Sequence, residues 1–448
     1  MQTSFTSAQL RDPRIREAND ILRKCVHCGF CTATCPTYLE LGEENDSPRG
    51  RIYLLRSLLE GTAEDPAEVA RHMDRCLTCL SCMTTCPSGV DYNHLLETGR
   101  ARLEEMGAAA RPLPIRLWRW LLNATIPHPG RLAMAVSLAR PFAGLARVLD
   151  RHSLLRPAAA MLRMACQARA VDRPLSGVFP ARNRRRGRIA LLQGCAQSVI
   201  AAHVNRATID LATRAGYDVI IPEAAGCCGA LTLHMGREED ARALARRNIT
   251  AWLDAEVEAV IVNASGCGVT VKDYDHLFRF DAEWRERANR IAAMSRDVNE
   301  WLAGLDLPEL AAPEPLVVAL HLPCSLQHGQ RILHAPRRLL EKAGFTVTEP
   351  AESHICCGAA GVYAILEPEI ATRLQTRKAG HLAATGADVI ASANFGCMHH
   401  IAEGTRLPVV HVVELLAWAA GGPPPPALAS TPLPTRTGSD HDGPETLP

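Results

Sequence analysis

The sequence predicts a multidomain protein, with a helical N-terminal domain, a helical linker, and two α/β domains of related sequence. Three observations support this fold class. Two similar cysteine runs lie within residues 25–87, an arginine-rich stretch broken by prolines covers 111–186, and one four-cysteine pattern occurs twice after residue 187. We place the domains at 1–110, 111–186, 187–305 and 306–420, followed by a proline-rich tail, 421–448, that is too poor in apolar residues to fold and is expected to be disordered.

The first domain is organised by the pattern C-x2-C-x2-C-x3-C-P, which appears twice. Its cysteines are Cys25, Cys28, Cys31 and Cys35 in the first run, and Cys76, Cys79, Cys82 and Cys86 in the second. In two-cluster ferredoxins, three cysteines of such a run wrap one [4Fe–4S] cube and the fourth reaches the other cube. This rule assigns Cys25, Cys28, Cys31 and Cys86 to one cluster, and Cys76, Cys79, Cys82 and Cys35 to the other. Structural zinc sites also use C-x2-C pairs, but two four-cysteine runs that each end in proline disfavour zinc.

Helices are expected around and between the two runs. Residues 7–24 look helical, the stretch from Ser47 to Arg51 opens an amphipathic helix over 52–60, and a further helix covers 66–75. Arg49 and Arg51 could screen cluster charge, face a partner, or simply be solvated at a helix start, and the sequence favours none of these interpretations.

Composition and charge indicate in which compartment the protein works and which classes of partner are not expected. The formal net charge of +1 gives no reason to expect nucleic acid. The first twenty residues lack the apolar core of a signal peptide, and no apolar run approaches the ~20 residues of a membrane-spanning helix. The chain has seventeen cysteines, and the grouping of most of them at metal-ligand spacings therefore indicates cofactor ligands rather than disulfides. We expect a cytoplasmic protein, with peripheral contact to the cytoplasmic face of the inner membrane as an open alternative.

The stretch 111–186 carries fifteen arginines against two aspartates, a local balance of +13. Its apolar, arginine-bearing helices are interrupted by prolines. Such a segment suits a docking surface for a partner subunit or an amphipathic contact with anionic lipid, and it is also compatible with a plain connector whose arginines are solvated. Cys166 stands alone here and is expected to be a small buried apolar residue.

The C-terminal half repeats itself. Cys195, Cys227, Cys228 and Cys267 recur as Cys324, Cys356, Cys357 and Cys397, at offsets of 129, 129, 129 and 130 residues. Such a register indicates a duplicated module. In each copy β-branched runs alternate with helical stretches, which predicts βαβ units around a mainly parallel sheet. Each cysteine follows a predicted strand, at the sheet edge where ligands gather.

The Cys-Cys-Gly pairs make residues 188–418 similar to the CCG cysteine-rich domain. This resemblance implies an additional cluster or redox site at the eight cysteines just named, because heterodisulfide reductase subunits hold iron–sulfur clusters there with five cysteines that close on C-x-x-C. In this chain Thr270 and His400 occupy the closing positions. His400 is a weak candidate ligand and Thr270 a poor one, so a cluster, a redox thiol pair and a structural remnant all stay open. His321, His328, His354 and His399 are expected to be packed or surface residues.

Over nearly its whole length the chain resembles glycolate oxidase iron–sulfur subunits. The resemblance is carried by CVHCGFCTATCPTYLELGEENDSPRGRIYLLRSLLEG and by LLQGCAQ, AGCCGAL, NASGCG and NFGC. It implies an α-helical ferredoxin domain like that of succinate dehydrogenase-type subunits, two [4Fe–4S] clusters, and flavoprotein partner subunits. The complex would oxidise glycolate to glyoxylate, with D-lactate as a second substrate, and pass electrons to an acceptor such as quinone rather than oxygen or NAD.

The residues agree with a relay role. No G-x-G-x-x-G motif opens a βαβ unit, so no flavin or nicotinamide site is expected in this chain, and no Ser-His-Asp arrangement or carboxylate pair indicates a catalytic residue. Alternatives are the iron–sulfur subunit of anaerobic glycerol-3-phosphate dehydrogenase, a heterodisulfide-reductase-like protein with chemistry at its paired cysteines, and a non-enzymatic scaffold.

Overall fold

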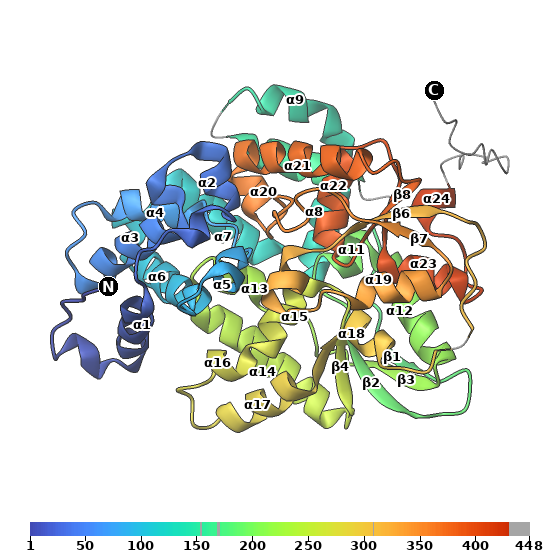
Figure 1. The fold of residues 1–448 in the computed structure, drawn as a ribbon. Helices are drawn as coiled ribbons and strands as arrows, with labels where there is room; N and C mark the ends of the chain where they lie inside the picture. Colours follow the sequence, from blue (N-terminus) through green and yellow to red (C-terminus); the bar gives the residue numbers. More distant parts are fainter. Residues whose placement is uncertain (153–154, 168–170, 308, 430–448) are drawn as a thin grey trace, which may run out of the picture.

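The structure, a computed structural model, describes residues 1–152, 155–167, 171–307 and 309–429. Helices make up the N-terminal part and the linker, and two separate sheets follow (Figure 1). This arrangement confirms the predicted multidomain fold class, a helical domain and linker followed by two α/β domains.

The N-terminal domain is built from short helices around the two cysteine runs. They are α1 (Pro13–Lys24), α2 (Pro36–Leu41), α3 (Pro48–Glu60), α4 (Pro66–Asp74), α5 (Ser81–Thr85) and α6 (Tyr92–Met106), with 3-10 turns at Gln9–Arg11, Phe30–Thr32, Glu44–Asp46 and Gly107–Ala109. The side chains of Ser47 and Asp65 cap α3 and α4 just before a proline, the residue best suited to the first helical position. The three predicted helices are confirmed, with ends shifted by a few residues.

The linker consists of α7 (Leu113–Thr125), α8 (Pro129–Ala139), a 3-10 segment (Arg140–Leu145), α9 (Ala146–Leu149) and α10 (Arg156–Gln167). Many of its apolar side chains are exposed: Leu113, Ile115, Leu117, Trp120, Leu121, Met134, Leu138, Phe142, Leu145, Val148 and Leu155. None of the helices in the described parts of the chain has the length and apolar character needed to cross a bilayer.

The first α/β domain has a five-stranded sheet in the order β1-β3-β2-β4-β5. Its strands are β1 (Gly177–Phe179), β2 (Gly187–Leu192), β3 (Tyr217–Ile221), β4 (Ala259–Val262) and β5 (Ser295–Asp297). Its helices are α11 (Gln197–Ile200), α12 (Ala202–Arg214), α13 (Ala230–His234), α14 (Glu238–Asp254), α15 (Ser265–Lys272), α16 (Tyr274–Leu277), α17 (Arg285–Met294) and α18 (Val298–Ala303). β1 lies inside the range predicted as helical linker, yet it pairs antiparallel with β3 and so extends this sheet.

The second α/β domain repeats the parallel part of that topology, with strand order β7-β6-β8-β9. Its strands are β6 (Val317–His321), β7 (Thr346–Thr348), β8 (Val389–Ser392) and β9 (Val409–His411), and its helices are a π turn (Ser325–Gly329), α19 (Ala335–Lys342), α20 (Tyr363–Leu366), α21 (Pro368–Ala383), α22 (Phe395–Glu403) and α23 (Val412–Ala419). In the expected disordered tail, α24 (Pro426–Ala429) is helical with Leu428 buried, and residues 430–448 lie outside the described residues.

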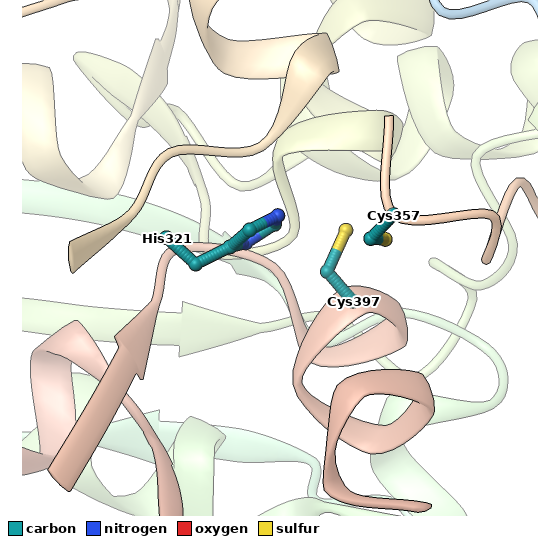
Figure 2. A group of neighbouring side chains, drawn as sticks. All are labelled: His321, Cys357 and Cys397. Atoms are coloured by element: carbon teal, nitrogen blue, oxygen red, sulfur yellow. The ribbon is translucent and has the colours of Figure 1, made fainter. Parts of the chain in front are cut away.

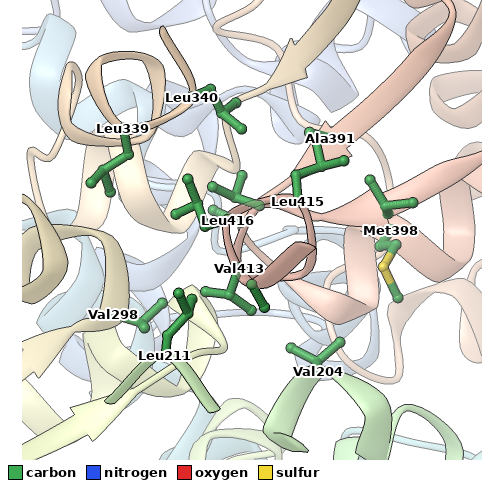
Figure 3. Close-up of a cluster of buried hydrophobic side chains, with 14 of the residues drawn as sticks. Val204, Leu211, Val298, Leu339, Leu340, Ala391, Met398, Val413, Leu415 and Leu416 are labelled. Atoms are coloured by element: carbon green, nitrogen blue, oxygen red, sulfur yellow. The ribbon is translucent and has the colours of Figure 1, made fainter. Parts of the chain in front are cut away.

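The two α/β domains share one apolar core. α12 packs against α23, and α18 packs against α19, so each domain contributes a helix to the other's face. Leu211 and Val298 of the first domain lie with Val413 of the second in one buried cluster (Figure 3). Burying a side chain of this size stabilises the fold by about 1.5–3 kcal/mol relative to exposure. The sheets are therefore held as one unit, with the cysteine-bearing edges of both fixed relative to each other.

The N-terminal domain contacts both α/β domains. α6 meets the turn after α13, where a Cβ on Gly236 would lie 2.3 Å from the Arg100 carbonyl oxygen, so glycine is required for this close approach. On the other side, α2 packs against α21, and Glu40 forms an ion pair with Arg377 at 2.9 Å. The loop of the second cysteine run also packs against the second α/β domain, where Leu77 lies in one buried cluster with Cys356.

Candidate metal centres

The first cysteine run lines a hollow next to α1. Cys25 ends that helix, and the loop behind it turns at His27 and Gly29, which have φ angles of 56° and 85°. A Cβ on Gly29 would lie 2.7 Å from a nitrogen of Arg49, so glycine lets the guanidinium approach the loop. Five cysteines line the hollow, three from the first run and two from the second: Cys25, Cys28, Cys31, Cys82 and Cys86.

A second hollow lies beside the first. It is lined by three cysteines of the second run and one of the first, namely Cys76, Cys79, Cys82 and Cys35. The loop takes up left-handed backbone at Thr78 and Leu80 before α5 begins. Cys82 lines both hollows, Cys35 reaches across to the second run, and Cys86 reaches across to the first. The division of the eight thiols between two clusters stays a prediction.

The chemistry of these thiols suits bound iron. Burial raises the pKa of the Cys79 and Cys82 thiols well above the usual range, and neighbouring cysteines raise it further. Buried thiolates therefore need a cation to be stable, and a coordinating metal ion supplies that charge. Eight thiols at two adjacent hollows fit two iron–sulfur cubes, which use four thiolate ligands each.

Arg51 provides a fixed positive charge beside the second hollow. Its side chain is only 1 % exposed, and one guanidinium nitrogen lies 3.9 Å from the Cys35 sulfur. Asp46 accepts a hydrogen bond from Arg51 at 3.2 Å and holds the guanidinium in place. Arg49 pairs with Glu44 at 2.7 Å, is partly exposed, and lies at the rim of the first hollow. Of the three interpretations left open for this pair, charge screening therefore fits Arg51, whereas both screening and solvation fit Arg49.

In the first α/β domain, four cysteines form a chain of sulfur contacts. Cys195 meets Cys227, Cys227 meets Cys228, and Cys228 meets Cys267. The contact with Cys227 and burial raise the pKa of Cys195 well above the ordinary value. For Cys228 the contact with Cys227 lowers the pKa, but the contact with Cys267 and burial outweigh it, so this pKa is also raised well above the ordinary value. A cavity opens over Cys227 between this domain and the start of α8, and it is also lined by His128, Arg131, Gln193, Arg247 and Asn248.

The second α/β domain has the same chain of thiols and adds an imidazole. The sulfur atoms of Cys324 and Cys356 are 3.7 Å apart, and Cys357 contacts both Cys356 and Cys397. His321, the last residue of β6, lies beside Cys357 and Cys397 (Figure 2). Burial lowers the pKa of His321 to about 3, so its ring is neutral. All four cysteines follow the carboxyl ends of parallel strands, as predicted for both copies.

The residues at the closing positions of the family pattern do not join the thiols. The His400 ring donates through Nε2 to the Ala371 carbonyl oxygen at 3.3 Å, and Thr270 is buried within α15. His328 lies 2.8 Å from the Thr84 hydroxyl and so links α5 to the second α/β domain. His399 is half-buried and His354 is exposed, and neither belongs to the His321 group. The side chain of Cys166 lies outside the described residues.

Known protein families match this chain over each of these regions. The model of the 4Fe-4S dicluster domain matches residues 21–90, and the model of the cysteine-rich domain matches residues 189–272 and 318–402. The glycolate oxidase iron–sulfur subunit of Escherichia coli (strain K12) is 40% identical over 425 residues, which cover 94% of this chain and 99% of the relative. The chain belongs to the glycolate oxidase iron–sulfur subunit family.

Further relatives agree with that assignment. The probable glycolate oxidase iron–sulfur subunit of Bacillus subtilis (strain 168) is 36% identical and covers 89% of this chain and 94% of its own length. Lactate utilization protein A of an Exiguobacterium strain is 27% identical over 51% of this chain and 96% of its own length. A hypothetical protein from Helicobacter pylori shares the fold, with a TM-score of 0.50 at 12% identity over 94% of this chain and 74% of that protein. The chain is thus an iron–sulfur protein and a subunit of an oxidoreductase.

Sequence reasoning missed two side chains of these sites. His321 was expected to be a packed or surface residue, yet it stands against Cys357 and Cys397. Lys378 was not considered, yet it is buried and close enough to the thiols of Cys356 and Cys357 for their charges to act on it. An alignment of the two copies could have identified both residues. It pairs His321 with Leu192 and Lys378 with Asn248, so a histidine and a lysine stand in the second copy where the first copy has uncharged residues.

Proposed function

We propose that this chain is the iron–sulfur electron-transfer subunit of a complex that oxidises glycolate to glyoxylate. The observation that carries the proposal is the near full-length similarity to the glycolate oxidase iron–sulfur subunit of E. coli, combined with eight cysteines gathered at two adjacent hollows. D-lactate is the second candidate substrate, because Lactate utilization protein A resembles half of the chain.

The chain's own residues hold and separate the redox centres. When bound, a [4Fe–4S] cluster accepts and releases single electrons. Cys25, Cys28, Cys31 and Cys86 would hold one cluster, and Cys76, Cys79, Cys82 and Cys35 the other. Arg51 offsets negative charge at the second cluster, and the apolar side chains of Pro48 and Ile52 limit access of water to the first. No residue of this chain is proposed to bind substrate.

Electrons would enter from flavoprotein subunits of the same complex. Hydride leaves glycolate as an electron pair, and a flavin can take up the pair and release its electrons one at a time. The acceptor would be a quinone or a similar compound, neither oxygen nor NAD. We further propose a cytoplasmic complex in peripheral contact with the cytoplasmic face of the inner membrane, where it would reach a quinone acceptor.

The linker supplies a surface for such contacts. Leu117, Trp120 and Leu121 of α7 and Met134 and Leu138 of α8 expose apolar side chains on arginine-bearing helices. Exposed apolar surface of this extent marks an interaction site. Flotation with liposomes that contain anionic lipid, carried out with and without the flavoprotein subunits, separates the alternatives: binding by the isolated chain indicates lipid, and loss of that binding in the complex indicates a protein interface.

The decisive experiment follows electrons through the purified complex. Glycolate is added anaerobically, and flavin bleaching and quinone or dye reduction are recorded for the unmodified complex and for the variants Cys86→Ala and Ser88→Ala. Both residues line the first hollow, but only Cys86 is a proposed ligand. We expect Cys86→Ala to retain flavin bleaching and lose acceptor reduction, and Ser88→Ala to retain both.

Three outcomes would contradict the proposal. Acceptor reduction at the unmodified rate in Cys86→Ala would show that electrons bypass this chain. Oxidation of glycerol-3-phosphate, or reduction of a heterodisulfide, without any response to glycolate or D-lactate would assign the chain to one of the alternative complexes. Flavin bound to the isolated chain would also contradict a pure relay role.

A further inference from the structure

The first strand of the second α/β domain ends in a histidine that faces two thiols. The ligand atoms of His321, Cys357 and Cys397 all lie within 4.8 Å of one another, and the three residues are buried (Figure 2). A tetrahedral metal ion bound by thiolates at about 2.3 Å and an imidazole at about 2.0 Å separates its ligand atoms by about 3.5 to 3.8 Å. The three side chains therefore stand within about 1 Å of the spacing that a single metal ion requires.

Ser392 orients the imidazole. Its hydroxyl oxygen lies 3.0 Å from Nδ1 of His321 and 3.5 Å from the Asn394 carbonyl oxygen. Because the hydroxyl donates its only hydrogen to that carbonyl, its oxygen accepts the Nδ1–H of His321. This tautomer leaves the lone pair of Nε2 for a ligand, which is how metal-binding histidines are commonly held. The Asn394 side chain also donates to the Cys397 sulfur at 3.3 Å.

A buried cation compensates the negative charge of the thiolates. Lys378 is 2 % exposed, and its ammonium donates to the carbonyl oxygens of Glu352 and Ser353 at 2.6 and 3.3 Å. Its amino group is therefore buried in the same domain as these thiols and held in place by two carbonyl oxygens. A buried ammonium at this place offsets the negative charge of thiolates that bind a metal.

The first α/β domain has apolar or neutral residues at the same places. His321 and Ser392 are partners in the β6–β8 ladder, and the matching partners in the β2–β4 ladder are Leu192 and Val262. Asn248 stands 130 residues before Lys378, the offset that also relates Cys267 to Cys397, and its amide binds the Cys227 carbonyl at 2.8 Å. The imidazole, its partner and the cation are thus all specific to the second domain.

We propose that the second α/β domain binds a transition-metal ion, iron(II) or zinc(II), through His321, Cys357 and Cys397, and that the first domain has no equivalent imidazole site. Cys356 contacts Cys324 and Cys357 but does not belong to this group, so the fourth position of a tetrahedral site is left to water or an added ligand. The site is continuous with the N-terminal domain, because Leu77 packs in one cluster with Cys356 and with partly buried Cys79 and Cys324. A centre here therefore lies against the loop of the second cysteine run.

The test measures metal in the full chain after anaerobic loading with iron and sulfide, or with zinc. Two [4Fe–4S] clusters account for about eight irons per chain. The variants are His321→Leu, Cys397→Ser and Ser392→Ala, with Cys267→Ser as the matched control in the first domain. Metal content is determined by elemental analysis, the ferredoxin-type signals by EPR, and the nitrogen ligand by X-ray absorption or pulsed EPR.

We expect at least one metal ion per chain beyond the eight ferredoxin irons, and we expect a nitrogen atom among its ligands. His321→Leu and Cys397→Ser should lose this metal and the nitrogen signature while the ferredoxin-type signals persist, and Cys267→Ser should keep it. Ser392→Ala should weaken metal affinity about 10- to 100-fold, as is typical when the partner of a metal-bound histidine is removed. The weaker metal affinity of Ser392→Ala can still be measured if His321→Leu does not fold.

Metal limited to the eight ferredoxin irons would overturn the proposal, as would additional metal that survives His321→Leu or that is lost equally in Cys267→Ser. The readout is independent of the proposed function. Metal content is measured on the isolated chain, whereas glycolate oxidation is measured as transfer from flavin to acceptor in the complex, so either proposal can fail alone.

Discussion

The imidazole rings of His94 and His276 stack face to face, with centroids 3.3 Å apart and planes inclined by 12°. His94 belongs to α6 of the N-terminal domain and His276 to α16 of the first α/β domain. Both ring nitrogens of His94 contact carboxylates, Asp91 at 2.6 Å and Asp273 at 2.9 Å, while His276 lies 3.2 Å from Glu17. The stacked histidines and their carboxylate partners therefore connect the N-terminal domain to the first α/β domain through charged contacts.

The contacts of His94 predict that the free energy of unfolding decreases at alkaline pH. Although burial opposes it, hydrogen bonding to Asp273 and Asp91 raises the pKa of His94 to about 10. A folded-state pKa above the unfolded value of about 6.5 means that the contribution is complete below pH ~6.5 and is lost as pH rises through about 10. Burial also raises the pKa of Glu97 to about 8, and this residue acts in the same direction because it too binds more protons in the folded state.

The measurement is the unfolding midpoint as a function of pH. Between pH 6.5 and 10 the midpoint should fall more steeply for the unmodified chain than for His94→Gln. Glu17, held near a pKa of about 2 by His276 and Arg279 although burial opposes this, contributes with the opposite sign below pH 4.5 and serves as an internal check. Equal slopes for the two proteins in the alkaline range would contradict a charged His94.

Asp74 is predicted to anchor the linker. Its carboxylate accepts two hydrogen bonds from Arg111, at 2.7 and 2.8 Å, and pairs with Arg119 at 3.5 Å, and both arginines are buried. Asp74→Ala leaves two buried guanidinium groups without this partner and should lower the free energy of unfolding by about 3–5 kcal/mol. Glu105→Ala, which removes an exposed pair with Arg102, should change it by less than about 1 kcal/mol. Urea unfolding checks both, and similar small losses would show that the linker arginines are merely solvated.

Arg51 is predicted to raise the reduction potential of the cluster at the second hollow. A charge about 7 Å from the cluster, at an effective dielectric constant of about 20, changes the energy of adding one electron by roughly 2.4 kcal/mol, or on the order of 100 mV. Arg51→Gln should therefore lower that potential by up to this amount, and Arg51→Lys by much less. Arg102→Gln, which removes an exposed arginine paired with Glu105, is the control. The potentials are measured by a redox titration followed by EPR, and equal shifts for the Gln variants at 102 and 51 would refute the prediction.

The crossed ligand sets predict which EPR signals disappear together. Cys35→Ser and Cys76→Ser should remove the same cluster signal, and Cys25→Ser and Cys86→Ser should remove the other, because Cys35 lies with the second run and Cys86 with the first. Each variant should retain about four of the eight irons. If Cys35→Ser instead removes the signal that Cys25→Ser removes, each run binds its own cluster.

Local signals in the sequence were sufficient for much of this architecture. The C-x2-C-x2-C-x3-C-P spacing places thiols within one loop, and a capping residue before a proline starts a helix at Ser47 and at Asp65 whatever lies around it. The recurrence of four cysteines at offsets of 129 and 130 residues likewise predicted two sheets of the same topology. Each of these features depends on neighbours along the chain, so each can be recognised without the fold.

The tertiary structure decided which distant residues meet. His400 was the candidate ligand by motif position, but its ring is turned to the Ala371 carbonyl. His321, which lies 79 residues earlier in the chain, faces the thiols instead. Arg51 reaches Cys35 because α3 packs across the second hollow, and His94 meets His276 across a domain boundary. Strand register and domain packing set these pairs, and both arise from burial summed over many residues, which the spacing within one motif does not encode.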